Sequence, residues 1–357
     1  MRKEQLDGLR FVLFLMVFAT HYAPNPLSVG YLGYALPVFF VMSGFLITNV
    51  LLSADQPSLA DRLKTFYLRR ILRICPAYYL VVGILIAMGS LSYPAYYLAY
   101  LLNIKLFIAS LDPSTAFEKW FVQGWRQESM HLWSLSVEEQ FYVLYPLLLY
   151  LTPVRYRIGL LFLVLLASIA ARLWLMAVFP RSFFGTLLPV CAEYFIWGCV
   201  FSCWERKKSL RSLSPSWTVT VAGIAAVGLI ITEFQLRQNG FLQFTTSNFQ
   251  TPIAMTMGFF IWGLWSIDDS HPFARLLTQK PLVYFGAMSY TLYLVHLLAL
   301  DCYRRFPINL PFSSHTDAVA GSFLLSLVMA MTIWHLFEKP IYSLKRYLPY
   351  SKTSGAW

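Results

Sequence analysis

Apolar stretches about as long as a membrane-crossing helix recur along this whole sequence. An α-helix needs roughly 20 consecutive apolar residues to cross the hydrocarbon core of a bilayer. Hydrophobic residues make up 58% of the chain and charged residues only 13%, and the mean hydropathy is +0.57. That composition is too apolar for a soluble protein of 357 residues. We therefore predict an all-α integral membrane protein with many transmembrane helices.

The number of crossings follows from the apolar stretches and the intervals between them. We count ten, and we expect one polytopic membrane domain over residues 1–357 with no appended soluble domain, because the intervals are too short to form one. The predicted spans lie near residues 9–25, 30–52, 75–92, 131–152, 157–179, 186–204, 216–235, 249–267, 282–303 and 317–337.

The positive charges favour ten crossings over eleven. Lys and Arg gather in MRKEQ, DRLKTFYLRRILR, RYR, ERKKSLR, FARLLTQK and SLKRYLPYSK. Ten spans place all of these on one side, as the positive-inside rule requires, with both termini in the cytoplasm. An eleventh crossing at the fairly apolar Leu91–Ile108 would put half of them outside. We therefore place that segment at the outer interface or as a re-entrant piece.

The net charge of +11 comes from the same short inner loops. It indicates topology and attraction to anionic membrane lipids, and we predict no nucleic-acid partner. The five cysteines have no metal-ligand spacing, so we predict no metal site and assign them packing roles. They are Cys75, Cys191, Cys199, Cys203 and Cys302.

Two ionisable residues share one face of the first predicted span. Arg10 lies near its inner end and His21 follows eleven positions later, which leaves the two side chains within roughly 20° of each other and about 16 Å apart along a helix. Arg10 alone could extend to the inner headgroups while His21 sits near the outer boundary. A polar cavity explains the aligned pair better, and an imidazole suits the role of a base at neutral pH.

The fourth predicted span carries a polar stripe. His131, Ser134, Glu138 and Tyr142 are spaced by three, four and four residues, so they line one side of a helix. A carboxylate inside an apolar helix is costly, and this favours a cavity beside Glu138. Glu139 is turned about 100° away, and we interpret it as an outer-interface carboxylate.

Other ionisable residues fall within predicted spans. His296 forms a row with Ser289 and Tyr293, and either a structural hydrogen bond to a neighbouring helix or a site role would account for it. Sequence alone gives no partners to the remaining ones, which are Arg172, Glu193 and His335.

A cluster of arginines precedes the apolar part of the third span. Arg69, Arg70 and Arg73 fall on one helical patch because they are separated by three or four residues. Guanidinium groups bind phosphates through paired hydrogen bonds, so the patch could hold a phosphorylated ligand. The positive-inside rule explains the same charges without any ligand.

Six stretches, taken in chain order, resemble the acyltransferase 3 family of integral-membrane O-acyltransferases, best represented by bacterial enzymes that modify surface polysaccharides. The resemblance covers nearly the whole chain. The stretches are LDGLR followed by ten residues and His21, PVFFVMSGFLIT, FYLRRILRICPAYYL, HLWSLSVEEQFYVLYP, SYTLYLVH and WHLFEKPIYSL.

The resemblance implies acyl transfer at the cell inner (plasma) membrane. An acyl group, expected to be acetyl, would pass from acetyl-CoA or another acyl-CoA in the cytoplasm to a hydroxyl of a carbohydrate, lipo-oligosaccharide or glycolipid acceptor. The acyl-CoA would be a donor substrate, with no tightly bound cofactor.

The resemblance also implies roles for residues. His21 and Arg10 match the paired signature of the family, and Glu138 matches the acidic residue of its fourth-span motif. These three would be catalytic, with Glu138 in an intramembrane passage beside His21. Separately, the arginines of the basic loop would bind the phosphates of coenzyme A; they are Arg69, Arg70 and Arg73.

Two departures from the family pattern affect these expectations. Glu193 lacks the arginine often found just before it. Many relatives also carry a secreted hydrolase-like domain after the tenth span, so we expect this chain either to complete the transfer alone or to pass its acyl group to a separate protein.

Two other classes of protein compete with the enzyme. A proton-coupled transporter of a lipid-linked sugar or an anion would also use intramembrane His, Glu and Arg. Such transporters often contain an internal repeat, and the motifs of the first five spans have no counterpart in the last five. A non-enzymatic scaffold has no need of buried charge.

Overall fold

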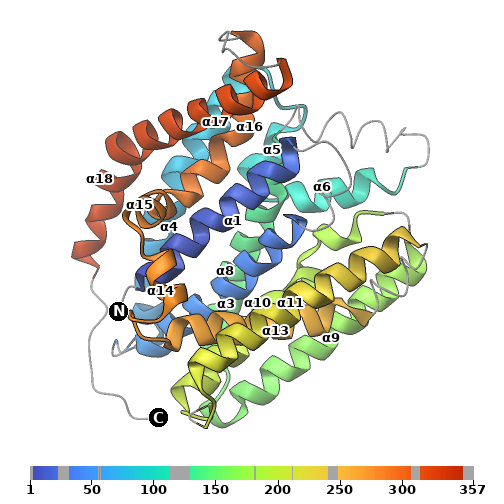
Figure 1. The fold of residues 1–357 in the computed structure, drawn as a ribbon, viewed down its shortest axis with the longest axis vertical. Helices are drawn as coiled ribbons and strands as arrows, with labels where there is room; N and C mark the ends of the chain where they lie inside the picture. Colours follow the sequence, from blue (N-terminus) through green and yellow to red (C-terminus); the bar gives the residue numbers. More distant parts are fainter. Residues whose placement is uncertain are drawn as a thin grey trace. The chain divides into compact units, whose positions relative to one another are not determined.

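In the computed structural model, every element of regular secondary structure in the described residues is a helix, which confirms the predicted all-α class (Figure 1). These residues are 3–22, 32–54, 56, 58–112, 129–180, 182–210, 212–239, 248–306 and 314–348. The chain divides into two compact units. The first unit comprises Met1–Asp55, Gln140–Gly286 and Lys352–Trp357, and the second comprises Gln56–Glu139 and Ala287–Ser351.

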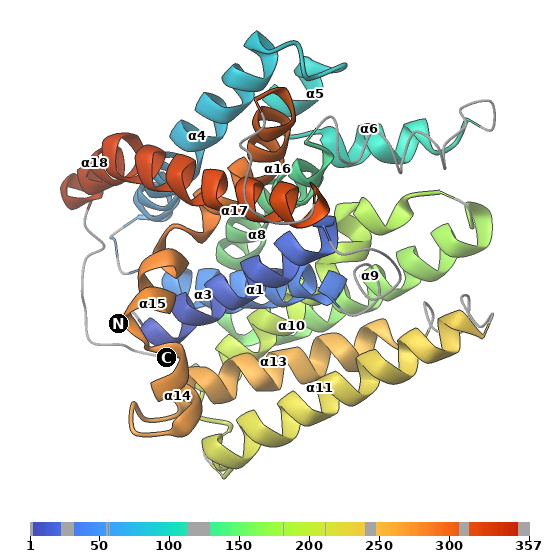
Figure 2. The same cartoon turned by 45° about the horizontal axis from the view of Figure 1, so that its top comes forward.

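Long helices make up most of the first unit. In chain order its helices are α1 (Glu4–Tyr22), α3 (Ala35–Ser53), the larger part of α8 (Trp133–Leu151), α9 (Arg157–Val178), α10 (Leu188–Arg206), α11 (Pro215–Gln238), α13 (Gln250–Ser266), α14 (Pro272–Leu277) and most of α15 (Lys280–Ala287). Figure 2 shows α11 and α13 running side by side.

Two glycines allow α3 and α10 to pack closely within the first unit. A Cβ atom at Gly44 of α3 would overlap the carbonyl group of Phe195, and one at Gly198 of α10 would overlap the carbonyl group of Val41. Small residues at such positions let membrane helices approach backbone to backbone, where dispersion contacts and hydrogen bonds hold them together. The close pair forms the centre of this unit.

Hydroxyl groups join α8 to α3 in the same unit. The hydroxyls of Thr48 and Tyr145 lie 2.7 Å apart and are buried. One turn earlier, the Tyr142 hydroxyl donates to the Ser43 hydroxyl at 3.0 Å. These bonds satisfy polar groups that would otherwise be costly in an apolar interior, and they account for Tyr142 of the predicted polar stripe.

The second unit has a different set of helices. In chain order they are α4 (Leu59–Ala87), α5 (Pro94–Leu98), α6 (Leu102–Ala109), the short 3₁₀ turn η2 (Met130–Leu132), the first residues of α8, α16 (Ser289–Arg305), α17 (Ser314–Ile333), the π-helix η5 (Trp334–Glu338), α18 (Lys339–Ser343) and the 3₁₀ turn η6 (Leu344–Tyr347).

Helix α4 begins well before the third predicted span, 75–92. It begins at Leu59, where the Ser58 hydroxyl caps it by accepting a bond from the Asp61 amide at 3.0 Å. The helix therefore includes the basic stretch, in agreement with the helical patch predicted for Arg69, Arg70 and Arg73. Hydropathy places the boundary where the charges end, whereas Arg, Lys and Leu are strong helix formers and continue the helix beyond it.

The segment Leu91–Ile108 forms two short helices, α5 and α6, separated by residues 99–101. The longer of them has eight residues, which at 1.5 Å per residue is far too short to cross a hydrocarbon core of about 30 Å. The shorter helix, α5, is held by α4, because the hydroxyls of Tyr78 and Tyr79 donate to the carbonyls of Tyr97 and Leu98.

Five helical stretches among the described residues are long and apolar enough to span a membrane, and the broken pair α15–α16 would make a sixth. The five are Leu32–Ser53, Leu59–Ala87, Val154–Val178, Pro215–Gln238 and Thr316–Tyr347. The other four predicted spans coincide with helices α1, α8, α10 and α13. The protein is thus a multi-pass membrane protein, while ten crossings and cytoplasmic termini stay predictions.

Candidate functional site

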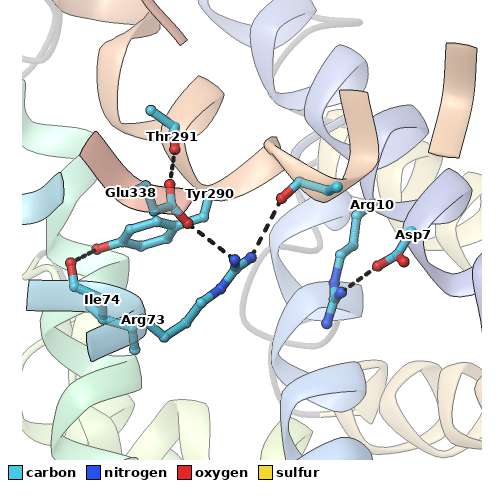
Figure 3. Close-up of polar contacts among 8 residues, drawn as sticks. Asp7, Arg10, Arg73, Ile74, Tyr290, Thr291 and Glu338 are labelled. Atoms are coloured by element: carbon cyan, nitrogen blue, oxygen red, sulfur yellow. Dashed lines mark hydrogen bonds and ion pairs between the residues drawn. The ribbon is translucent and has the colours of Figure 1, made fainter. Parts of the chain in front are cut away.

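The guanidinium group of Arg73 is held by several groups of the second unit (Figure 3). Its Nη1 atom lies 3.1 Å from a carboxylate oxygen of Glu338, and its Nη2 atom donates to the carbonyl of Ala287 at 3.5 Å. The rings of Trp334 and Tyr342 complete the surroundings, with centroids 5.4 and 5.0 Å from Cζ. Cation–π contacts and an ion pair therefore fix one orientation of this side chain.

Glu338 is almost inaccessible, with 1% of its side chain exposed. It ends the π-helix η5, a helix type that often occurs at functional sites. The Thr291 hydroxyl donates to its second carboxylate oxygen, and the nearby Tyr290 hydroxyl donates to the Ile74 carbonyl at 3.1 Å (Figure 3). The residue pairs beside Arg73 thus join α4, α16 and η5.

The other two predicted donor-binding arginines have different surroundings. Arg69 donates to the carbonyl of Leu348 beyond η6. Arg70 interacts electrostatically with Glu139 of α8. All three arginines are half-buried on one side of α4, as their spacing predicted.

The polar rows of the fourth and ninth predicted spans meet in the second unit. The hydroxyls of Ser134 and Tyr293 lie 2.6 Å apart, and the Tyr293 hydroxyl donates to the carbonyl of His131 at 2.7 Å. The rings of His131 and His296 stand edge to face with centroids 4.5 Å apart. Both histidines also bond the Tyr293 carbonyl, at 2.9 and 2.7 Å. This bond of His296 lies within its own helix α16, whereas the structural interpretation expected a bond to a neighbouring helix.

The two adjacent glutamates of α8 face different neighbours. Glu138 interacts electrostatically with Tyr293, the tyrosine bonded to Ser134. This agrees with a helical phase that puts Glu138 and Ser134 on one stripe. Glu139 has an inaccessible Oε1 atom with no hydrogen-bond partner among the described residues and lies near Arg70. Glu139 is half-buried as a residue, and its place at the outer interface stays a prediction.

In the first unit, Arg10 has an acidic partner that the sequence interpretation overlooked. Its Nη1 atom lies 2.8 Å from an Asp7 carboxylate oxygen, and the two residues are one helical turn apart (Figure 3). Asp7 is buried while Arg10 is about 30% exposed. His21 lies at the other end of α1 and is also buried. Both predicted catalytic residues of α1 thus stand on one continuous helix.

Arg172 and Glu193 give each other the partners that sequence could not. Arg172 of α9 and Glu193 of α10 form an ion pair of 3.3 Å, and Arg172 also donates to the Thr251 hydroxyl of α13. The arginine missing just before Glu193 is thus supplied by a neighbouring helix of the first unit.

Comparison with known proteins assigns the chain to a family. The model of the family described as "Acyltransferase domain", the acyltransferase 3 family, matches residues 3–336. The chain is 28% identical over 321 residues to the peptidoglycan O-acetyltransferase OatA of Listeria monocytogenes, a match covering 82% of this chain and 48% of the relative. It is 26% identical over 356 residues to the O-acetyltransferase OatA of Staphylococcus aureus, covering 94% and 56%. No solved structure matches it.

The fold and the family match together define a multi-pass membrane protein of the acyltransferase class. This chain belongs to the acyltransferase 3 family, and the resemblance drawn from its motifs is confirmed. The chain spans about half the length of the curated relatives that it matches.

Two polar residues at the described sites were not singled out from sequence, Asp7 and Glu338. A signal for Glu338 was present, because it is an acidic residue that directly follows the apolar run of the last predicted span. Asp7 precedes Arg10 by three residues, the spacing at which side chains of a helix pair.

Proposed function

We propose that this protein transfers an acetyl group from cytoplasmic acetyl-CoA to a hydroxyl of a cell-envelope carbohydrate or glycolipid. The observation that carries the donor assignment is the arginine patch of α4, where Arg73 is oriented by Glu338 and Arg69 and Arg70 lie on the same helical side. A phosphate-rich donor suits such a patch, because guanidinium groups form paired, charge-assisted bonds to phosphates.

The reaction requires a base. The acceptor hydroxyl attacks the thioester carbonyl carbon, a C–O bond forms, the C–S bond breaks and coenzyme A leaves as a thiol. The base takes the hydroxyl proton and returns it to the departing sulfur. We assign this role to His21, because imidazole is the side chain that most often serves as a general base.

Arg10 and Glu138 have supporting roles in this proposal. Arg10 lies at the opposite end of α1 from His21 and is paired with Asp7, so it would orient the donor from that end through a charge-assisted hydrogen bond, away from the reacting carbonyl. Glu138 would accept a hydrogen bond from the acceptor hydroxyl and orient it for attack. The role of Glu138 is tested by substitution below.

A carbohydrate acceptor is supported by what the relatives are called. One relative is named a peptidoglycan O-acetyltransferase and the other an O-acetyltransferase. We propose a sugar hydroxyl of the cell envelope, presented on a polysaccharide, lipo-oligosaccharide or glycolipid, and we place the protein in the cell inner membrane. A transporter, the alternative class, would need no thioester donor.

The experiment is a comparison of envelope glycans from cells with and without the gene. Mass spectrometry should find acetyl esters that disappear on deletion and return with the wild-type gene. Return of the esters with a His21→Ala gene expressed at the same level would remove His21 from the mechanism. Unchanged esters on deletion would reject the proposed acceptor class.

A further inference from the structure

The C-terminal segment of the second unit places a further cation beside the arginine patch. We propose that Lys345 and Tyr342 bind a phosphate group of the acyl-CoA donor together with Arg69. This inference rests on the proposed function and adds two binding residues to it, from α18 and η6, that motif comparison leaves unassigned.

Two arginines of the patch already have carboxylates beside them. Arg73 is paired with the buried carboxylate of Glu338, and Arg70 interacts electrostatically with the half-buried Glu139. Each of these pairs has little net charge seen from a distance. A donor with a diphosphate and a 3′-phosphate needs more positive charge than two balanced arginines supply.

Lys345 lies over the ring of Tyr342. Its Nζ atom lies 3.8 Å from the centroid of the Tyr342 ring, whose other neighbour is the Arg73 guanidinium, 5.0 Å away. Arg69 also acts electrostatically on Tyr342. Tyr342 therefore sits among three cations from two parts of the chain.

The cluster formed by Tyr342, Lys345 and Arg69 has the chemical groups that bind phosphate. Tyr342 presents a ring face and a hydroxyl to Lys345, and neither is an acidic side chain that pairs with the ammonium group. Phenol, ammonium and guanidinium groups together offer hydrogen bonds of the kind that phosphate oxygens accept. Tyr342 and Lys345 are half-buried, which limits screening by salt without closing the site to ligand.

A neighbouring residue provides a matched control. Arg346 follows Lys345 in η6, carries the same charge and is exposed, but its guanidinium contacts the ring and hydroxyl of Tyr347 instead. Neutralising either residue changes the net charge of the protein by the same amount. Only Lys345 belongs to the cluster around Tyr342.

The experiment measures binding of acetyl-CoA and of 3′-dephospho-coenzyme A to the purified full chain in lipid nanodiscs. Lys345→Gln should weaken acetyl-CoA binding about tenfold, the loss expected for one charge-assisted hydrogen bond. Lys345→Arg should retain most of the affinity, and Tyr342→Phe should weaken binding by a few-fold. Arg346→Gln should change it less than twofold. Thermal unfolding of each variant checks that the fold is retained.

The outcomes separate this inference from the proposed function. Equal losses in Lys345→Gln and Arg346→Gln would reduce the effect to general surface charge and overturn the inference. So would unchanged affinity in Lys345→Gln alongside weakened binding in Arg69→Lys, a result that leaves the proposed donor intact. A wild-type protein that binds neither coenzyme would instead reject the proposed donor, and with it this site.

Discussion

Arg172 and Glu193 are joined by a 3.3 Å ion pair in which the two side chains are 1% and 0% exposed. A charge so deeply buried is tolerated when it is paired and hydrogen-bonded. Thr251 adds a bond to the guanidinium group. The pair connects α9 and α10 of the first unit, and we assign it a structural role.

Removing one partner of this pair should destabilise the protein. Arg172→Leu or Glu193→Gln leaves the other charged group buried, which typically costs about 3–5 kcal/mol. Replacing both with apolar residues, as in Arg172→Leu with Glu193→Leu, should recover much of that loss. Thermal unfolding of purified variants in one detergent checks this, and two single variants as stable as wild type would contradict the structural role.

His21→Ala should lower the acyl-transfer rate by about 10² to 10⁴, the usual contribution of a positioned general base. The side chain is buried at the end of α1. Transfer from labelled acetyl-CoA by membranes that contain equal amounts of protein is the measurement. Near-wild-type rates would exclude His21 as the base.

The adjacent glutamates of α8 should separate kinetically. Glu138→Gln should lower kcat, because Glu138 lies on the stripe with Ser134 and is proposed to orient the acceptor. Glu139→Gln should mainly change KM for the donor, because its neighbour is Arg70. Steady-state kinetics with varied acetyl-CoA distinguishes them, and identical effects on both constants would mean that the helical phase assigned to α8 is wrong.

Arg→Lys changes in α4 distinguish donor binding from topology. Lysine keeps the charge but loses the two-pronged geometry, so Arg69→Lys or Arg70→Lys should weaken acetyl-CoA binding about tenfold if these residues bind phosphates. Arg73→Lys should also weaken it, because lysine cannot keep both the Glu338 pair and the Ala287 bond.

The competing explanation makes the opposite prediction for the same variants. Lysine satisfies the positive-inside rule as well as arginine does, so charges that serve only topology would tolerate all three changes. A topology reporter confirms that each variant inserts correctly. Unchanged donor affinity in three correctly inserted variants would reduce the arginine patch to a signal for membrane orientation.

The sequence predicted where the helices lie but not which residues pair with the buried charged side chains. Each predicted span contains a helix because an apolar run of this length has one stable way to satisfy its backbone in lipid. Helix α4 begins before the predicted span, since hydropathy detects the membrane boundary and not the first residue of the helix. The ion pairs that join helices depend on tertiary packing, and no local pattern encodes which arginine meets Glu193 or Glu338.

Spacing within one helix was a better guide than spacing between helices. The phase of α8 correctly put Ser134 and Glu138 on one side, because 3.6 residues per turn fixes it. The neighbour of Glu139 could not be read in this way, since it comes from α4. The same limit explains why Tyr342 and Lys345 were not connected with arginines more than 250 positions earlier in the chain.

We propose that this membrane protein transfers an acetyl group from acetyl-CoA to an envelope sugar. The most direct measurement supplies radiolabelled acetyl-CoA to the cytoplasmic face of sealed membrane vesicles and follows the label into glycans. We predict labelled acetyl esters with the wild-type protein and a loss of at least about a hundredfold with His21→Ala. Equal labelling in wild-type, His21→Ala and protein-free vesicles would show that the protein does not transfer the acetyl group.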